Sequence, residues 1–536
     1  MSDSYTFNGG HLINGSWINS GTDSTFHATN PATGEALDGT FQTANSEQVD
    51  QAFSAATAAF KATRNEPADK WADLLDAIAD GLNERADSLV ARAEAESALP
   101  QTPRLRGELG RTTGQLKAFA SLVREGSCVD AVIDTANPDR QPLPKPDVRR
   151  MRTGIGPVVV FGASNFPLAF GTLGGDTASA LAAGNPVLVK GHPGHPGTSE
   201  IVAAAVSEAL TKVGLPQGVF SLLQGVGNEL GAAMVTHADA EAVGFTGSLR
   251  GGRALFDLAA QRDKPIPVFA EMGSLNPLVL LPGAIAERSE AIATGLAGSL
   301  TLGAGQFCTK PGLTLVIDDP QTNQFLDQLT SKLSETSTFT MLGSNLQQAF
   351  GGVTQSFGST DGVNTRLAGS CDGHAGATAG LYEVDSATWK SQQALHEEAF
   401  GPAGLVVRCK SLEDLVDTLS HVEGSLTGSV HAGEGDAESA VSQVAQALAA
   451  VSGRVIFNGY PTGVEVCHAM HHGGPYPATT ASGTTSVGTA AIQRFMRPVA
   501  YQDAPQSVLP TELQDTNNRG IMRQVDGEYT RDAISK

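Results

Sequence analysis

The chain has 536 residues, 40% of them hydrophobic and 17% charged, which is typical of a globular protein with two or three structural units. Its 56 acidic and 35 basic residues give a formal net charge of −21, which argues against a surface that binds nucleic acid or an anionic membrane. No apolar run in the sequence approaches the roughly 20 residues that cross a membrane, so we expect neither a membrane segment nor a nucleic-acid partner.

The cysteines are five in number and widely spaced, which fits neither a disulfide framework nor a paired zinc motif. A reducing compartment is the default for such a pattern. The first residues, Met-Ser-Asp-Ser-Tyr-Thr, contain neither a basic region nor an apolar core. We therefore expect no signal peptide and a cytoplasmic location.

The first 45 residues predict short strands and turns, because Asn-Gly and Pro-Ala-Thr-Gly are turn signals. Alanines and leucines at three- and four-residue spacing then predict helices over 46–62 and 70–99. A further helix is predicted over 104–123 and carries Arg104 and Arg111, which are notable in so acidic a chain.

The stretch 134–153 is rich in proline and charge, unlike a core element of a compact domain. We interpret it as an extended arm or an edge hairpin, with disorder as the alternative.

A regular alternation of strands and helices follows, which predicts a parallel sheet covered by helices, with its ligand at the carboxyl ends of the strands. The predicted strands are 157–161, 187–190, 219–223, 242–245 and 266–270. Two helices are predicted over 171–183 and 198–213, and Thr198 or Ser199 caps the second. Two further helices are predicted to begin near 231 and 248.

A second alternation comes after Cys308 and predicts a second α/β unit. Its predicted strands are 313–317, 403–407, 426–430 and 455–457, and its predicted helices are 324–333, 411–419 and 437–450. The end, 484–501, is strand-like and is expected to complete a sheet with the arm at 134–153.

Cys308 lies in the segment Gly303-Ala-Gly-Gln-Phe-Cys-Thr-Lys-Pro311. Glycines allow unusual backbone conformations and a close approach of ligand, and a thiolate on such a segment is a strong nucleophile. A buried cysteine that serves only packing is the alternative.

Two strand-to-helix turns are rich in glycine and fit a dinucleotide site with phosphates at a helix N-terminus. The first holds Gly225, Gly227 and Gly231, where the third glycine comes one residue later than in the Rossmann fingerprint. The second contains Gly247 and Ser248.

Four polar residues end strands or lie in loops. Lys190 is a candidate for ribose or phosphate, with an ordinary surface lysine as the alternative. Asn165 could donate to an oxyanion and Glu271 could serve as a general base. Glu398 follows Glu397 before Phe-Gly-Pro, where a solvated turn is the alternative.

The histidines include two close pairs, His192 with His195 and His471 with His472. No further ligand is placed convincingly, so we expect no metal site. A Cys-His protease is disfavoured because no histidine stands out and the nucleotide turns would have no use.

These stretches occur together in the order found in the aldehyde dehydrogenase superfamily, which the chain resembles from about residue 10 to 500. The resemblance implies that Cys308 is the nucleophile and Glu271 the general base. Asn165 and the backbone N–H of Cys308 would form the oxyanion hole. The resemblance departs at Glu271-Met-Gly-Ser-Leu-Asn276, where the family usually has Glu-Leu-Gly-Gly-Lys-Asn.

The resemblance also implies an NAD(P) site. Lys190 and Glu398 would hold ribose hydroxyls, Phe400 would pack near the nicotinamide ribose, and Gly225, Gly247 and Ser248 would lie near the phosphates. NAD-preferring relatives often place a glutamate three residues after the strand lysine, where this chain has Pro193. We therefore expect NADP, with NAD possible.

The fold implied is α/β, with a Rossmann-type cofactor domain, an α/β catalytic domain and a β flap for assembly into a homodimer or homotetramer. The expected boundaries are 1–133 and 154–272 for the cofactor domain, 273–480 for the catalytic domain, 134–153 and 484–501 for the flap, and 502–536 for a C-terminal tail.

Four segments carry a finer resemblance: Arg104-Leu-Arg-Gly-Glu-Leu-Gly-Arg111-Thr-Thr-Gly-Gln-Leu, Lys190-Gly-His-Pro-Gly-His-Pro-Gly-Thr, His472-Gly-Gly-Pro-Tyr-Pro-Ala-Thr and Thr484-Thr-Ser-Val-Gly-Thr-Ala-Ala-Ile. By these segments the chain looks most like the 2,5-dioxovalerate (α-ketoglutarate semialdehyde) dehydrogenases of the family, which implies aldehyde oxidation through a cysteine thioester. Such a substrate carries a carboxylate, so Arg104 and Arg111 are the candidates to bind it, beside Phe166 and Phe307. A surface or structural ion pair is the alternative for both arginines. The rival functions are a fatty or medium-chain aldehyde dehydrogenase, a coenzyme A-acylating enzyme, which typically lacks the glutamate, and a non-catalytic nucleotide-binding protein.

Overall fold

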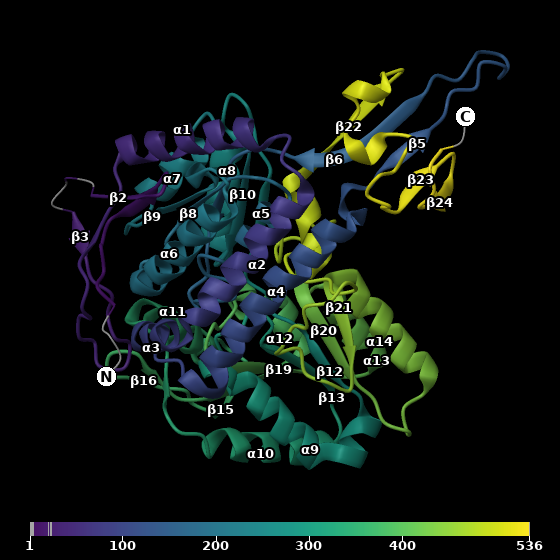
Figure 1. Cartoon of the computed structure of the whole chain (residues 1–536). Helices are drawn as coiled ribbons and strands as arrows, with labels where there is room; N and C mark the ends of the chain where they lie inside the picture. The colour runs from purple at the N-terminus through teal and green to yellow at the C-terminus, as the bar shows by residue number, and fades with distance from the viewer. Residues whose placement is uncertain (1–4, 20, 22–23, 535–536) are drawn as a thin grey trace.

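The computed structural model describes residues 5–19, 21 and 24–534. Two bodies, each built on a seven-stranded sheet with helices around it, lie next to each other, and a third, five-stranded sheet projects away from them (Figure 1). The predicted α/β fold is therefore confirmed. Among the described residues, no helix has both the length and the apolar character that a membrane crossing requires.

The first sheet has the strand order β11-β10-β7-β8-β9-β1-β2. The five strands from β7 to β11 run parallel to one another. Its strands are β1 (His11–Ile13), β2 (Ser16–Ile18), β7 (Val158–Phe161), β8 (Val187–Lys190), β9 (Phe220–Leu223), β10 (Ala242–Thr246) and β11 (Val268–Glu271).

Helices cover both faces of this sheet, which is why its strands are continuous apolar runs. Val159 and Val160 are neighbours in β7, yet each belongs to a different hydrophobic cluster, one on each face. The helices are α1 (Ser46–Thr63), α2 (Ala68–Glu84), α3 (Ala86–Ser97), α4 (Arg106–Glu125), α5 (Gly175–Ala182), α6 (Pro196–Val213), α7 (Glu229–Thr236) and α8 (Leu249–Ala260).

The second sheet has the order β15-β18-β19-β13-β12-β20-β21, with only β15 antiparallel to its neighbour. Its strands are β12 (Leu278–Leu280), β13 (Leu313–Ile317), β15 (Asn364–Leu367), β18 (Gly380–Asp385), β19 (Ala403–Cys409), β20 (Ser425–His431) and β21 (Ser452–Phe457). The helices of this body are α9 (Pro282–Thr301), α10 (Pro320–Ser334), α11 (Ser344–Ser359), α12 (Ser386–Ser391), α13 (Leu412–Ser420) and α14 (Glu438–Val451).

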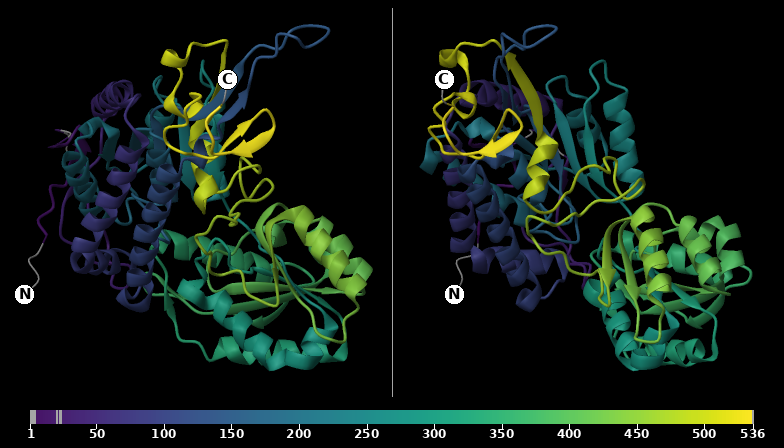
Figure 2. Two further views of the ribbon diagram at one scale, coloured as in Figure 1. Left: turned by 45° about the vertical axis from the view of Figure 1, so that its right-hand side comes forward. Right: turned by 90° about the vertical axis from the view of Figure 1, so that its right-hand side faces the viewer.

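The third sheet, in the order β22-β6-β5-β23-β24, joins the arm to the end of the chain (Figure 2). Its strands are β5 (Val132–Asp134), β6 (Val148–Gly154), β22 (Met496–Gln502), β23 (Arg523–Val525) and β24 (Glu528–Thr530). The expectation of an edge hairpin at 134–153 that pairs with the end of the chain is confirmed, because β6 pairs with both β5 and β22. The stretch 502–536, expected to be only a tail, adds β23 and β24 to this sheet.

Several predicted bounds were wrong. The helix over 70–99 is two helices, separated at Arg85, whose backbone (φ −102°, ψ 11°) leaves the helical region. Helix α6 begins at Pro196 rather than at a Thr198 or Ser199 cap, and the Thr198 hydroxyl instead donates to Glu96. Residues 489–495 form a 3₁₀ helix, so only 496–502 of the strand-like end is a strand.

Candidate active site

The segment before Cys308 is a tight left-handed turn. Gly303, Ala304 and Gly305 have φ of +58°, +58° and +67°, a region that residues other than glycine seldom adopt. A Cβ on Gly305 would lie 2.2 Å from the carbonyl oxygen of Gly401, so the turn packs directly on the loop that contains Glu398. Cys308 follows this turn and is partly exposed.

Asn276 holds the backbone of the cysteine in place. Its Nδ2 donates to the carbonyl oxygens of Cys308 and Lys310, each at 2.8 Å. Its Oδ1 accepts from the backbone N–H and the hydroxyl of Thr427, at 3.2 and 2.9 Å. The sequence motif contains Asn276, but only the folded chain shows that it orients the nucleophile.

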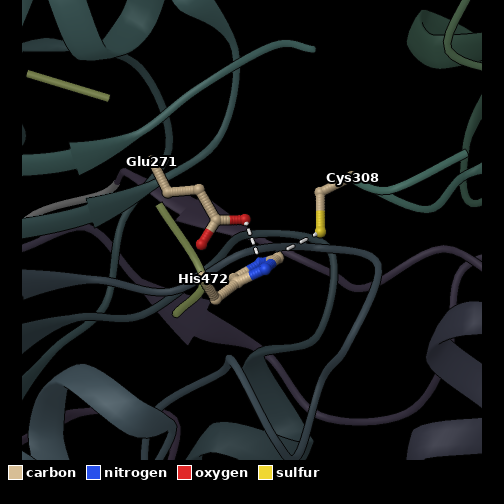
Figure 3. Close-up of side chains that lie close together, drawn as sticks. All are labelled: Glu271, Cys308 and His472. Atoms are coloured by element: carbon tan, nitrogen blue, oxygen red, sulfur yellow. Dashed lines mark hydrogen bonds and ion pairs between the residues drawn. The ribbon is translucent and has the colours of Figure 1, made fainter. Parts of the chain in front are cut away.

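Glu271, Cys308 and His472 converge on one point (Figure 3). Nε2 of His472 lies 2.9 Å from Oε1 of Glu271 and 3.6 Å from Sγ of Cys308. The other carboxylate oxygen of Glu271 accepts from the Ser486 hydroxyl at 2.7 Å. The sequence prediction that no histidine stands out was wrong.

The segment that follows His472 runs beside the end of β11, which explains the contact. Met272 donates to the carbonyl oxygen of Ala478 at 2.8 Å, and Thr480 donates to that of Ala270 at 3.1 Å. This segment has no strand or helix of its own, so its position depends on these long-range bonds. No local signal could have placed His472.

Burial raises the pKa of the Cys308 thiol well above its usual value, and the charge of Glu271 adds to the effect. Burial also acts to raise the pKa of Glu271, but the contacts with His472 and Ser486 outweigh it and leave this pKa below its usual value. The resting site therefore holds a neutral thiol beside an ionised carboxylate. The imidazole of His472 lies within reach of both groups.

The donor atoms of these three residues lie within 4.8 Å of one another, a grouping that sequence reasoning did not find. Sulfur, nitrogen and carboxylate oxygen are donors that zinc accepts. The absence of a metal stays a prediction.

Asn165 follows β7 and reaches the cysteine segment. Its Nδ2 donates to the carbonyl oxygen of Gln306 at 2.9 Å, and the side chain is buried. An amide nitrogen has two hydrogens, so one N–H remains for an oxygen of a substrate.

Arg104 is occupied by the protein itself. It donates to the carbonyl oxygen of Asn165 at 2.7 Å, pairs with Glu108 at 3.3 Å, and lies 4.1 and 4.9 Å from the ring centres of Phe166 and Phe307. Through these contacts Arg104 fixes the loop that contains Asn165.

Arg111, one and a half helical turns inside α4, keeps part of its guanidinium free. Nη1 donates to the carbonyl oxygen of Val464 at 2.8 Å, whereas Nη2 is buried with no hydrogen-bond partner among the described residues. The guanidinium lies 5.3 Å from the ring centre of Phe170, and that ring is 6.4 Å from the ring of His472. Of the two predicted arginines, Arg104 pairs with a carboxylate, whereas Arg111 pairs with none and keeps a buried nitrogen without a partner among the described residues.

The carboxyl ends of β8 and β10 carry the predicted cofactor residues. Lys190 ends β8, its burial lowers its pKa to about 8, and within the described chain it forms no ion pair or hydrogen bond. Ser248 caps α8, with its hydroxyl accepting from Gly251 at 3.2 Å. A Cβ on Gly247 would lie 2.6 Å from the ring of Phe245. A half-buried ammonium without a protein partner can bind a ribose hydroxyl or a phosphate, and the N-terminus of α8 can bind a phosphate.

Gly225 lies between β9 and α7 and packs closely on its surroundings, because a Cβ there would lie 2.9 Å from the side chain of Leu230. The glycine is therefore explained in part by packing within the protein.

Glu398 lies in the loop after η5 (Gln393–His396) and accepts from the backbone N–H of Ser274 at 3.2 Å. Lys310 stands beside it, 1% exposed, and was not anticipated from the sequence. Its Nζ donates to the carbonyl oxygens of Ala399, of Gly401 at 3.2 Å and of Ala403 at 3.0 Å. Lys310 thus ties the cysteine segment to the Glu398 loop.

Burial raises the pKa of Glu398 to about 7, although the charge of Lys310 opposes the shift. Burial likewise lowers the pKa of Lys310 to about 8. Phe400 is half-buried in the same loop, and its backbone N–H donates to the carbonyl oxygen of Glu398 at 3.1 Å.

Comparison with known proteins shows near-full-length similarity. Residues 17–498 match the model of the aldehyde dehydrogenase family. The chain is 47% identical to α-ketoglutaric semialdehyde dehydrogenase 2 of Azospirillum brasilense, covering 97% of this chain and 99% of that one. It is 41% identical to an α-ketoglutaric semialdehyde dehydrogenase of Acinetobacter baylyi, over 98% of this chain and 99% of that one.

Solved structures share the fold at low identity. An aldehyde dehydrogenase from Pseudomonas aeruginosa matches with a TM-score of 0.78 at 21% identity, covering 93% of this chain and 97% of that one. An indole-3-acetaldehyde dehydrogenase complexed with NAD⁺ matches with a TM-score of 0.78 at 20% identity, with the same coverage of 93% and 97%.

Proposed function

The chain belongs to the aldehyde dehydrogenase family, and on that basis we propose that it oxidises α-ketoglutarate semialdehyde (2,5-dioxovalerate) to 2-oxoglutarate. Members of this family oxidise aldehydes to carboxylic acids with NAD(P), and this chain is such an oxidoreductase. The substrate proposal is supported by similarity over nearly the whole chain to two α-ketoglutaric semialdehyde dehydrogenases. The observation that carries the chemistry is the convergence of Cys308, His472 and Glu271.

The first step is activation of the thiol. The proton of Cys308 leaves to a water molecule, and the ring of His472, whose Nε2 lies 3.6 Å from Sγ, stabilises the thiolate that remains. The carboxylate of Glu271 accepts from the same nitrogen at 2.9 Å and so fixes the ring. The imidazole thus offsets the burial and the negative charge that raise the pKa of Cys308.

The thiolate then attacks the aldehyde carbon, and a C–S bond forms as the carbonyl oxygen becomes an oxyanion. The free N–H of Asn165 and the backbone N–H of Cys308 donate to that oxyanion. NAD(P), when bound, accepts the hydride from the former aldehyde carbon. A thioester on Cys308 remains.

Glu271 accepts a proton from a water molecule, which attacks the thioester carbon. The C–S bond breaks, the carboxylic acid leaves the site, and Cys308 is left as a thiolate. A buried carboxylate with a low pKa is ionised at neutral pH and is therefore ready to act as the base. The retained Glu271 favours hydrolysis over transfer of the acyl group to coenzyme A.

For the cofactor, Lys190 and Glu398 would hold ribose hydroxyls, Phe400 the nicotinamide ribose, and Gly225, Gly247 and Ser248 the phosphates. We favour NADP over NAD, since Pro193 leaves no carboxylate at the third position after Lys190 to repel a 2′-phosphate. Lys190 is also without an acidic partner in the described chain.

For the substrate, we assign the carboxylate to Arg111 and an aromatic wall to Phe166 and Phe307, whose rings meet edge to face at 5.1 Å. Arg104 becomes a positioning residue for Asn165.

We propose that the two seven-stranded sheets belong to the cofactor and catalytic domains and that the five-stranded sheet is the flap, where β22 at the edge suits pairing with a second copy. A homodimer or homotetramer in the cytoplasm is part of the proposal. All five cysteines are unpaired, in keeping with a reducing compartment.

The test is turnover of the purified enzyme with 2,5-dioxovalerate, hexanal and a long-chain aldehyde, each with NADP⁺ and NAD⁺. We expect fastest turnover of the dioxo acid with NADP⁺ and none in Cys308→Ala. Faster turnover of the aliphatic aldehydes would overturn the substrate assignment and favour the fatty aldehyde alternative. Full activity of Cys308→Ala would overturn the mechanism.

A further inference from the structure

Two arginines from distant parts of the chain hold one loop. Arg454 in β21 donates from Nη2 to the carbonyl oxygen of Pro461 at 2.9 Å and from Nη1 to that of Gly463 at 3.3 Å. Arg111 in α4 donates to the next carbonyl, that of Val464. Each guanidinium keeps one buried nitrogen with no hydrogen-bond partner among the described residues, Nε in Arg454 and Nη2 in Arg111.

Arg454 lies against the segment that carries His472. A Cβ on the preceding residue, Gly453, would be 2.0 Å from the carbonyl oxygen of Gly473, so the backbones of β21 and this segment touch. Nη1 of Arg454 is also 3.9 Å from the sulfur of Met470. His472, between these two contacts, is 3.6 Å from Sγ of Cys308.

The charges around both arginines are not balanced. Within the described residues neither Arg454 nor Arg111 forms an ion pair with a carboxylate. Burial lowers the pKa of both guanidinium groups, and a thiolate at Cys308 would oppose this shift in each. Glu108, Glu271 and Glu465 also act on Arg111 from a distance. Half-buried cations that keep unused donors are costly unless an anion joins them.

We infer that Arg454 is a second specificity-determining residue, which binds the carboxylate of an oxo-acid aldehyde together with Arg111. This inference rests on the proposed function and deepens it. A carboxylate has two oxygens, and the two unpartnered nitrogens come from two residues joined through the 461–464 loop. The loop holds both guanidinium groups, which reduces the ordering that binding of an anion requires.

The test compares two aldehydes of the same chain length. In Arg454→Met we expect kcat/KM for 2,5-dioxovalerate to fall by roughly 10- to 100-fold, the loss of one hydrogen bond to a charged group. The value for pentanal, which has neither carboxylate nor oxo group, should change by less than about threefold. Arg454→Lys should restore part of the loss, since it returns the charge without the planar donors.

Arg262 supplies the matched control. It also donates to carbonyl oxygens of one loop, those of Val235, Ala238 and Ala240. Arg262 follows α8 and belongs to the body of the first sheet. Arg262→Met should leave the ratio of the two kcat/KM values unchanged.

If Arg454→Met fails to fold, the inhibition of pentanal oxidation by 2-oxovalerate decides. This anion should compete with pentanal in the wild type and bind at least about fivefold more weakly to Arg454→Lys. An equal loss for both aldehydes, or unchanged inhibition, would overturn the role of Arg454. A wild-type enzyme with no activity on 2,5-dioxovalerate would instead overturn the proposed function.

Discussion

Cys308 and His472 are 164 residues apart in the chain, yet Sγ of one lies 3.6 Å from Nε2 of the other. Burial and Glu271 both raise the pKa of the thiol, whereas this contact sets a ring N–H beside the sulfur, where it stabilises a thiolate. The reactivity of the cysteine is therefore expected to depend on His472.

Replacing His472 tests this dependence. His472→Phe should lower the rate of the first hydride transfer at neutral pH by about 10- to 100-fold, the loss of one hydrogen bond to a charged group. Because the thiol then keeps its raised pKa, alkylation by iodoacetamide should need a higher pH. Stopped-flow detection of the first equivalent of NADPH measures the rate. His471→Phe, at the neighbouring position, should keep both the rate and the alkylation profile of the wild type.

Replacing Glu271 separates the two halves of the reaction. Glu271→Gln keeps the size of the side chain but removes the base for water, so the thioester should accumulate. A burst of up to one equivalent of NADPH per site should precede a steady state slowed by about 10²- to 10⁴-fold. Rapid quench and mass spectrometry should find the acyl group on Cys308. Steady turnover without a burst would contradict the assignment of Glu271 to hydrolysis.

The parallel strands β7 to β11 of the first sheet, and β13, β19, β20 and β21 of the second, could be predicted because they are short apolar runs that alternate with helical segments. Strands β12, β15 and β18 were not predicted. Helix α11 was missed because its glycines and serines lower helix propensity, and tertiary contacts such as those of the buried Phe350 and Phe357 hold it to the second body. His472 was missed because long-range backbone bonds alone place its segment.

The two arginines of the helical region show another limit of sequence reasoning. Arg104 and Arg111 are seven residues apart and look equivalent in the sequence. Arg104 donates to the carbonyl oxygen of Asn165 and pairs with the carboxylate of Glu108, whereas Arg111 donates to a single carbonyl oxygen, that of Val464. Which guanidinium is left for a ligand is decided by tertiary contacts that no spacing reveals.

Cofactor affinity should depend on pH through Glu398. Only the ionised carboxylate accepts hydrogen bonds from two ribose hydroxyls, and the pKa of this group in the free enzyme is raised to about 7. As pH rises through that value the carboxylate ionises, so the Kd for NADP⁺ should fall. Fluorescence titration between about pH 6 and about pH 8 measures the trend. A Glu398→Gln variant should bind more weakly and with little dependence on pH over this range.

Lys310 should support both stability and cofactor binding. Lys310→Met would leave the carbonyl oxygens of Ala399, Gly401 and Ala403 without their shared donor, at a cost of about 1–3 kcal/mol in the free energy of unfolding. The loop of Glu398 would loosen, so the Kd for NADP⁺ should rise while alkylation of Cys308 changes little. Thermal unfolding and titration measure the two effects. Lys212→Met, on the exposed end of α6, is the control and should change neither.

Asn276 offers a way to separate backbone strain from positioning of the nucleophile. It adopts φ +51°, so Asn276→Ala combines the cost of a left-handed alanine with the loss of bonds to Cys308, Lys310 and Thr427. Asn276→Gly loses the same bonds but tolerates the backbone conformation. If positioning of Cys308 matters, both variants should lower kcat by about tenfold or more. If the left-handed backbone conformation matters more than these bonds, Asn276→Gly should keep wild-type kcat while only Asn276→Ala loses activity. We expect the first result, because the carbonyl of Cys308 itself is one of the groups that Asn276 holds, and release of that carbonyl lets the thiol move away from His472.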